Sequence, residues 1–188
     1  DEGPQLAFDR EGVWVAVWSS RNDLGGTIGT DMDLFVSRSL DNGATWSVPV
    51  PLNTDAATDG STDDRGPEIA ADGFGNFIAM WIASEEVNFA RSNDGGVTWS
   101  DPATIGTAGF ESLPDTLSPR LATNRSGGWV AVWSDDSSGD ADIMVSQSGD
   151  GGFNWNPPSP VNSNAATDVG DELVPYVAAD GEGNWIAV

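Results

Sequence analysis

The sequence predicts an all-β fold, a β-propeller of four-stranded antiparallel blades with about three and a third blades present in 188 residues. One segment recurs four times without gaps, and a shorter octamer recurs three times between those copies. No stretch shows the apolar periodicity of an amphipathic helix. The longer repeat begins at Pro4, Pro67, Pro119 and Pro175, which are 63, 52 and 56 residues apart.

Each copy of the longer repeat predicts a β-hairpin. A short apolar stretch follows the proline, a turn such as 72–75 or 180–183 interrupts it, and a β-branched and aromatic run comes next. A third strand is predicted over 34–38 and 143–147, and a fourth opens at Thr45. Asp-Gly turns join the third strand to the fourth. Four strands in each unit of about 55 residues are typical of propeller blades.

We expect one propeller region over 1–188. Its predicted blades are 1–62, 63–114 and 115–170, followed by a half-blade at 171–188. Closed propellers usually contain about four to eight blades. We therefore expect the ring to be completed by further blades of a longer chain or by self-association. The first alternative is favoured, because the last predicted strand is interrupted at Val188.

The octamer S-x-D-x-G-x-x-W occurs at 39–46, 92–99 and 148–155. Its aspartate can accept backbone N–H bonds within a turn, its glycine tolerates positive φ, and its tryptophan can pack between blades. The octamer resembles the Asp-box, or bacterial neuraminidase repeat, of sialidase-like propellers, which forms the turn between the third and fourth strands. The resemblance implies structural roles for Asp41, Gly43, Trp46, Asp94, Gly96, Trp99, Asp150, Gly152 and Trp155.

Composition excludes several kinds of chemistry. The chain has 30 Asp and Glu against seven basic residues, all Arg, for a net charge of -23. We expect no nucleic-acid partner, since phosphate binding needs clustered cations. The absence of His and Cys excludes Ser-His-Asp and Cys-His triads, disulfides and zinc sites with nitrogen or sulfur ligands. No apolar run approaches the roughly 20 residues needed to span a bilayer.

The residue after each repeated proline differs between copies, although the next two positions stay apolar. These residues are Gln5, Glu68, Arg120 and Tyr176, which we expect to converge at one level of the channel mouth. Arg65, two positions before its proline, also departs from the repeat. Framework roles should recur from blade to blade, whereas site roles need not, so these positions are the candidates for a functional site.

The resemblance implies one catalytic interpretation of these residues. Sialidases hold a substrate carboxylate with three arginines, use a Glu-activated Tyr as nucleophile, and use an Asp as general acid. Arg65, Glu68, Arg120 and Tyr176 are the catalytic residues that this interpretation predicts, with Arg21 as a third arginine. The alternative is that all of them are ordinary polar residues of the channel mouth, and both interpretations stay open.

Acidic loops between the second and third strands suggest calcium. Carboxylates alternating with glycine can surround this ion with about six to eight oxygens. The sequence predicts a calcium site at Asp135, Asp140 and Asp142, against the alternative of a solvated acidic loop, and no cofactor is otherwise required. The loop at 22–33 has a similar composition. A further segment, 52–59, recurs closely at 161–168, which indicates a shared structural role.

Three functional classes remain. The favoured one is an extracellular, non-catalytic module that binds a glycan or an extracellular protein for display or adhesion. The first alternative is part of a sialidase-like exo-glycoside hydrolase. The second is a structural surface or filament subunit, which predicts concentration-dependent assembly. The extracellular location follows from the resemblance, because Asp-box proteins are commonly secreted, and strong acidity favours solubility.

Overall fold

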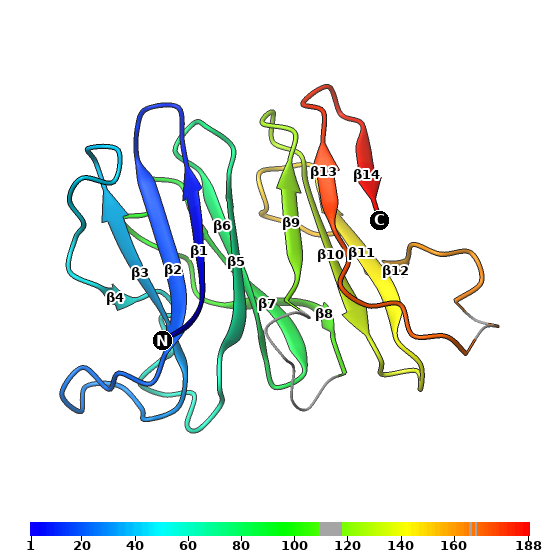
Figure 1. The fold of residues 1–188 in the computed structure, drawn as a ribbon, viewed down its shortest axis with the longest axis horizontal. Coiled ribbons are helices and arrows are strands. Elements are labelled where there is room, and N and C mark those ends of the chain that lie inside the picture. The colour runs from blue at the N-terminus through cyan, green and yellow to red at the C-terminus, as the bar shows by residue number, and fades with distance from the viewer. Residues whose placement is uncertain (110–117, 166, 168) are drawn as a thin grey trace.

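The computed structural model describes residues 1–109, 118–165, 167 and 169–188. Within these residues every regular element is a strand, and no helix capable of crossing a membrane is found among them. The strands form three four-stranded antiparallel sheets and one two-stranded sheet (Figure 1). The all-β prediction is therefore confirmed.

Each sheet follows chain order, so neighbouring strands are also consecutive in sequence. Blade 1 contains β1 (Glu2–Phe8), β2 (Trp14–Ser20), β3 (Asp33–Ser39) and β4 (Val50–Pro51). Blade 2 contains β5 (Arg65–Ala71), β6 (Phe77–Ala83), β7 (Glu86–Ser92) and β8 (Ala103–Thr107). Blade 3 contains β9 (Arg120–Thr123), β10 (Trp129–Asp135), β11 (Asp142–Ser148) and β12 (Ser159–Pro160). The last pair is β13 (Val177–Ala179) and β14 (Trp185–Ala187).

The blades stand side by side, and their first strands are neighbours. Strand β1 contacts β5, β5 contacts β9, and β9 contacts β13 (Figure 1). This row of first strands places the residues that follow the repeated prolines on adjacent strands. The four sheets thus form an arc of a propeller, with equivalent positions of successive blades next to one another.

In blades 1 and 2 the turn between the first and second strands is held by an aspartate side chain, and in blade 3 Asn124 takes its place. In blade 1, Asp9 Oδ1 accepts the N–H groups of Glu11 and Val13, both at 2.9 Å. In blade 2, Asp72 Oδ1 accepts those of Phe74 and Asn76 at 2.8 and 3.3 Å. Short polar side chains that bond their own backbone favour turns, which explains why the repeat places Asp here.

The three octamers form the turns between the third and fourth strands. In blade 2, Ser92 Oγ donates to Asp94 Oδ1 and accepts from the Gly96 N–H, both at 2.8 Å. Thr98 completes the turn, because its N–H and hydroxyl donate to the two oxygens of Asp94 at 3.0 and 2.6 Å. The other two octamers repeat this pattern, with Asn154 in place of the threonine in blade 3.

These bonds also set the charge state of the octamer carboxylates. The hydrogen bond from the Thr45 hydroxyl, followed by that from the Thr45 N–H, lowers the pKa of Asp41 to about 2. The Asn154 N–H and side chain likewise lower the pKa of Asp150 to about 2. Hydrogen bonds to the charged form of a carboxyl favour that form. The turns therefore keep the carboxylates of Asp41 and Asp150 ionised at a more acidic pH than an ordinary aspartate.

The core lies between blades. Residues of blades 1 and 2 share one buried cluster, against which Trp99 packs, and residues of blades 2 and 3 share a second, against which Trp155 packs. Each of these tryptophans thus packs between its own blade and the preceding one. The equivalent Trp46 of blade 1 is 42% exposed, and its indole N–H donates to the Gly43 carbonyl at 3.1 Å.

The octamer of one blade also contacts the third strand of the blade before it. Arg38 Nε donates to the Gly95 carbonyl at 2.6 Å, and the Arg91 guanidinium lies 3.5 Å from the centroid of the Phe153 ring. A Cβ added at Gly96 would lie 2.8 Å from a methyl group of Val15. Glycine at this position therefore permits close contact between blades.

Gly96→Ala should destabilise the protein more than Gly43→Ala. Both glycines have positive φ, so each substitution should cost roughly 1 kcal/mol of backbone strain. At Gly96 the new methyl group also meets Val15, whereas at Gly43 it meets only Trp46 at 3.9 Å. Overpacking should add about 1–3 kcal/mol for Gly96→Ala. Urea unfolding of both variants measures the difference, and equal losses would show that the octamer glycine does not limit blade packing.

Candidate functional site

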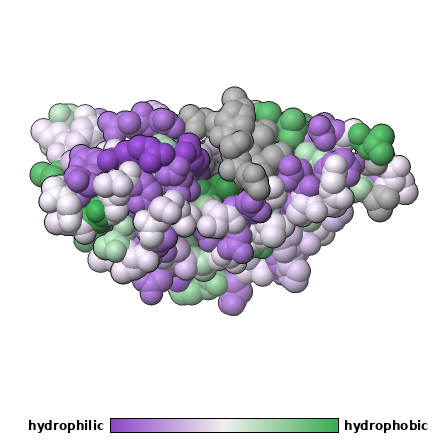
Figure 2. All heavy atoms as spheres, turned by 90° about the horizontal axis from the view of Figure 1, so that it is seen from below, coloured by the Kyte–Doolittle hydropathy of each residue, from purple (hydrophilic) through white to green (hydrophobic). Residues whose placement is uncertain are grey.

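The β2–β3 and β4–β5 loops and the start of β1 share the lower edge of the molecule in Figure 1. The octamer turn of blade 1 lies at the opposite edge. Figure 2 views the lower edge from below and shows hydrophilic residues gathered over its left half, where blade 1 lies. The hydrophilic residues seen at this edge therefore lie on the side away from that turn.

The first strands of all four sheets contribute to one pocket. Gln5 of β1, Glu68 of β5, Arg120 of β9 and Tyr176, which precedes β13, line it together with Leu121 and Val177. Its volume is about 280 Å³. The structure thus brings together the four residues that follow the repeated prolines. Their catalytic role stays a prediction.

Arg120 joins the polar groups of this pocket. Its Nη1 lies 3.4 Å from Glu68 Oε2, and the two side chains are 17% and 18% exposed. The guanidinium also lies 5.0 Å from the centroid of the Tyr176 ring. Burial raises the pKa of Glu68 to about 7, although the charge and hydrogen bond of Arg120 act to lower it. The pocket therefore holds a carboxyl that titrates near neutral pH beside a cation and an aromatic ring.

Arg65 does not line this pocket. Its guanidinium pairs with Asp63, which also accepts a hydrogen bond from Arg21 Nη2 at 2.9 Å. Burial opposes ionisation of Asp63, but the Met32 N–H and the two arginines outweigh it and lower the pKa of this carboxyl. All three arginines that the sequence predicted for a substrate clamp therefore already pair with carboxylates of the protein.

The predicted calcium residues of blade 3 have separate partners. Asp135 accepts the Ser137 N–H at 2.9 Å and the Thr107 hydroxyl at 2.8 Å. Asp142 lies opposite Asp135 in the β10–β11 register and accepts from the Asn162 side chain at 3.2 Å. Asp140 Oδ2 is buried and has no hydrogen-bond partner within the described ranges. Calcium binding by these three residues stays a prediction.

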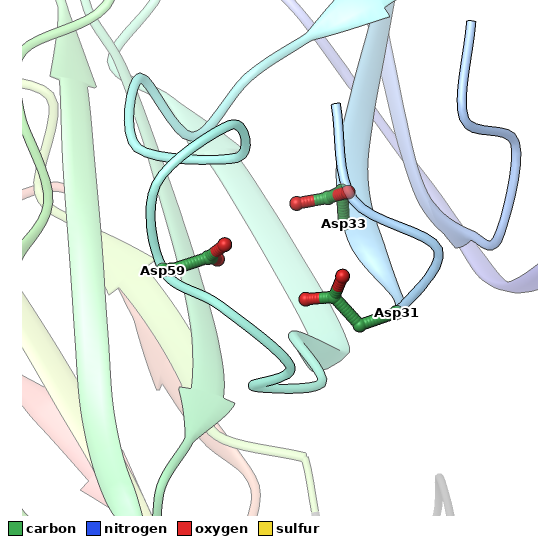
Figure 3. A group of neighbouring side chains, drawn as sticks. All are labelled: Asp31, Asp33 and Asp59. Carbon is green, nitrogen blue, oxygen red and sulfur yellow. The ribbon is translucent and has the colours of Figure 1, made fainter. Parts of the chain in front are cut away.

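A different acidic group gathers in blade 1. Oxygens of Asp31, Asp33 and Asp59 lie within 4.8 Å of one another, and it is the one such group in the described part of the chain (Figure 3). The loop at 22–33 and the recurring segment at 52–59 both stand out in the sequence, but nothing in the sequence places them together. The missing signal was their proximity, which arises because β3 and β4 pair in one sheet.

Comparisons with known proteins give structural relatives only. No protein-family model matches the chain, and no curated protein sequence matches it. The structure resembles that of Hadza microbial sialidase Hz136, with a TM-score of 0.59 and 20% sequence identity, over 94% of this chain and 39% of the sialidase.

Two further structures are similar. The Penicillium chrysogenum alpha-L-arabinanase complexed with arabinobiose has a TM-score of 0.59 and 16% identity, over 98% of this chain and 57% of the arabinanase. The Trypanosoma rangeli sialidase in complex with sialic acid has a TM-score of 0.58 and 14% identity, over 99% of this chain and 33% of the sialidase. The chain spans less than two thirds of each of these structures. At these identities the similarity shows the fold alone, that of a β-propeller of the sialidase and arabinanase kind.

Proposed function

We propose that this chain is part of an extracellular β-propeller that binds a glycan in the pocket of Gln5, Glu68, Arg120 and Tyr176 without cleaving it. The observation that supports this proposal most directly is the 57% exposure of Tyr176 at a pocket with three polar side chains. Aromatic rings present an apolar face with a polar tip, and a few placed polar groups fix the orientation of a ligand. Both features suit a sugar ring with its hydroxyl groups.

The described residues of the pocket do not include the pair of groups that glycoside hydrolysis requires. Most glycosidases use two carboxyl groups, and those with a tyrosine nucleophile need it activated. Glu68 is the single carboxyl among the described lining residues, and its hydrogen bond joins Arg120 rather than Tyr176. Arg120 Nη1 in turn contacts Glu68 at 3.4 Å. This arrangement supports binding over catalysis.

One observation favours the alternative of a sialidase-like hydrolase. A general acid works best when its pKa lies near the working pH. The pKa of Glu68 is raised to about 7 by burial, and the Tyr176 ring is a neighbour of its partner Arg120. In this alternative Glu68 holds the proton, Arg120 binds an anionic group, and residues of other blades complete the site.

Two substitutions of Tyr176 separate the alternatives. Tyr176→Ala should weaken glycan binding by at least about tenfold, because stacking area is lost, whereas Tyr176→Phe keeps the ring and should bind normally. Calorimetric titrations with sialyllactose and with arabinobiose measure affinity, and aryl sialosides and arabinosides measure turnover. Phe74→Ala is a matched control, because Phe74 is 63% exposed on the β5–β6 turn.

The outcomes are distinct for binding and catalysis. Binding without turnover, lost only in Tyr176→Ala, supports the proposed module. Turnover that disappears in Tyr176→Phe would instead identify a hydrolase with a tyrosine nucleophile. Equal affinities for Tyr176→Ala and Phe74→Ala would contradict a glycan site in this pocket.

A further inference from the structure

Two loops of blade 1 bring three aspartates together. Asp31 and Asp33 lie at the start of β3, and Asp59 comes from the loop between β4 and β5. Figure 3 shows these three side chains projecting from the two segments toward a common space, and their carboxylate oxygens lie within 4.8 Å of one another. Two ligands that are each about 2.4 Å from a calcium ion can be at most about 4.8 Å apart. The three carboxylates therefore lie close enough for one ion to approach all of them.

Four oxygens of these three carboxylates are buried without hydrogen-bond partners among the described residues. Asp31 is 5% exposed and Asp33 is 0% exposed. Both oxygens of Asp31, Oδ2 of Asp33 and Oδ1 of Asp59 are buried and accept no hydrogen bond within the described ranges. None of the ion pairs found there includes any of the three residues. Buried carboxylates are normally hydrogen-bonded, paired or bound to metal, so the arrangement points to a cation as their partner.

Asn53 fixes the orientation of this group. Its Nδ2 donates to Asp33 Oδ1 at 3.3 Å and to Asp64 Oδ2 at 2.7 Å, while its own Oδ1 accepts the Leu34 N–H at 3.1 Å. One oxygen of Asp33 is thus held by Asn53, and the other is left for a ligand. The negatively charged side chains of Asp31 and Asp59 lie beside Asp33 and repel it. A divalent cation would relieve this repulsion.

We propose that Asp31, Asp33 and Asp59 form a binding site for a calcium ion. All available ligands are oxygens, which suit a hard cation, and the chain has no His or Cys to bind a softer one. Calcium accepts about six to eight oxygens in flexible geometry, whereas magnesium requires a near-ideal octahedron. Three carboxylates from two irregular loops suit the larger ion.

Blade 3 repeats part of this scaffold. Asn162 Nδ2 donates to Asp142 Oδ1 and to Glu172 Oε2, both at 3.2 Å, as Asn53 does to Asp33 and Asp64. The counterpart of Asp59 is Asp168, which lies outside the described residues. Blade 2 differs, because its β6–β7 connection is a tight turn in which Ser84 and Glu85 both have positive φ. This scaffold therefore accompanies the long connection between the second and third strands and is not a general feature of every blade.

Calcium titration of the chelator-treated 188-residue chain tests the proposal. Isothermal titration calorimetry should give saturable calcium binding, and calcium should raise the unfolding temperature. Asp31→Asn and Asp59→Asn should each remove one equivalent of bound calcium or weaken it at least about tenfold. In the presence of chelator, the unfolding temperature of both variants should equal or exceed that of the wild type, because each substitution removes one of three carboxylates that repel one another. A purely structural role for Asp31 would give the opposite result.

Glu11→Gln provides a control with the same change in charge. Glu11 is exposed on the β1–β2 turn, so its substitution should leave calcium binding unchanged. The proposal is overturned if the wild-type chain neither binds calcium nor gains stability at about 10 mM, well above the weakest dissociation constants of calcium modules. It is also overturned if Asp31→Asn and Asp59→Asn bind as many ions as tightly as the wild type.

Discussion

Trp133→Ala should lower the free energy of unfolding by about 3–5 kcal/mol, the usual cost of removing a buried Trp from a core. Trp133 is 0% exposed and belongs to the buried cluster that blades 2 and 3 share. Its indole N–H donates to the Thr107 carbonyl at 2.7 Å, and a Cβ at Gly106 would lie 2.7 Å from its ring. The substitution therefore opens a cavity and leaves a backbone acceptor of the neighbouring blade without its donor.

The repeat supplies a matched control for this prediction. Trp18 occupies the same position in blade 1, but it is half-buried, and its ring stacks on Phe35 with centroids 6.1 Å apart. Because Trp18→Ala removes less buried area and no bond to a neighbouring blade, it should cost clearly less than Trp133→Ala. Urea unfolding of the two variants checks this order. Equal losses would mean that packing between blades contributes no more than packing within one.

Local sequence signals were sufficient for the turns and for the first three strands of each blade. The fourth strand of blade 1 begins at Val50 and not at Thr45 as predicted, because Thr45 still lies within the octamer turn. Asp9, Asp72 and the octamer aspartates act on backbone groups two to four residues away, so their patterns predict turns without knowledge of the fold. The same patterns cannot distinguish Trp18 from Trp133, since burial depends on which blade lies alongside. The repeat predicted both residues at one structural position, but only the assembled sheets assign them different environments.

The candidate sites likewise divide into one that the repeat predicts and one that depends on how the loops fold. Gln5, Glu68, Arg120 and Tyr176 meet because they occupy one repeat position, and a repeat turns equal positions into neighbours in space. Asp31 and Asp59 occupy different repeat positions, and their meeting depends on the paths of two long loops. The pairing of Arg65 with Asp63 likewise follows from the local course of the chain before β5. Sequence periodicity therefore predicts contacts between residues at the same repeat position of neighbouring blades. It does not predict contacts between loops at different repeat positions.

Glu68 should make the protein less stable as pH rises from about 4.5 to about 7. Burial raises the folded-state pKa of Glu68 to about 7 from an ordinary 4.5, so between these values the folded chain keeps a proton that the unfolded chain has released. Stability falls with rising pH wherever the folded state binds more protons. The difference of roughly 2.5 pH units corresponds to a loss on the order of 3 kcal/mol, complete above pH 7.

Glu68→Gln isolates this contribution, because glutamine resembles the protonated carboxyl and does not titrate. The stability of the variant relative to wild type should rise across this pH range, as measured by urea unfolding at closely spaced pH values, while other carboxyls contribute equally to both proteins. Arg120→Gln should extend the loss to higher pH, since the Arg120 charge and hydrogen bond lower the Glu68 pKa of the folded protein. A flat difference between wild type and Glu68→Gln would show that Glu68 ionises normally despite its burial. A measured loss of stability of this size would show that the pKa of Glu68 is strongly raised. Strongly perturbed pKa values cluster at functional sites, so this result would support the pocket of Glu68, Arg120 and Tyr176 as a ligand site.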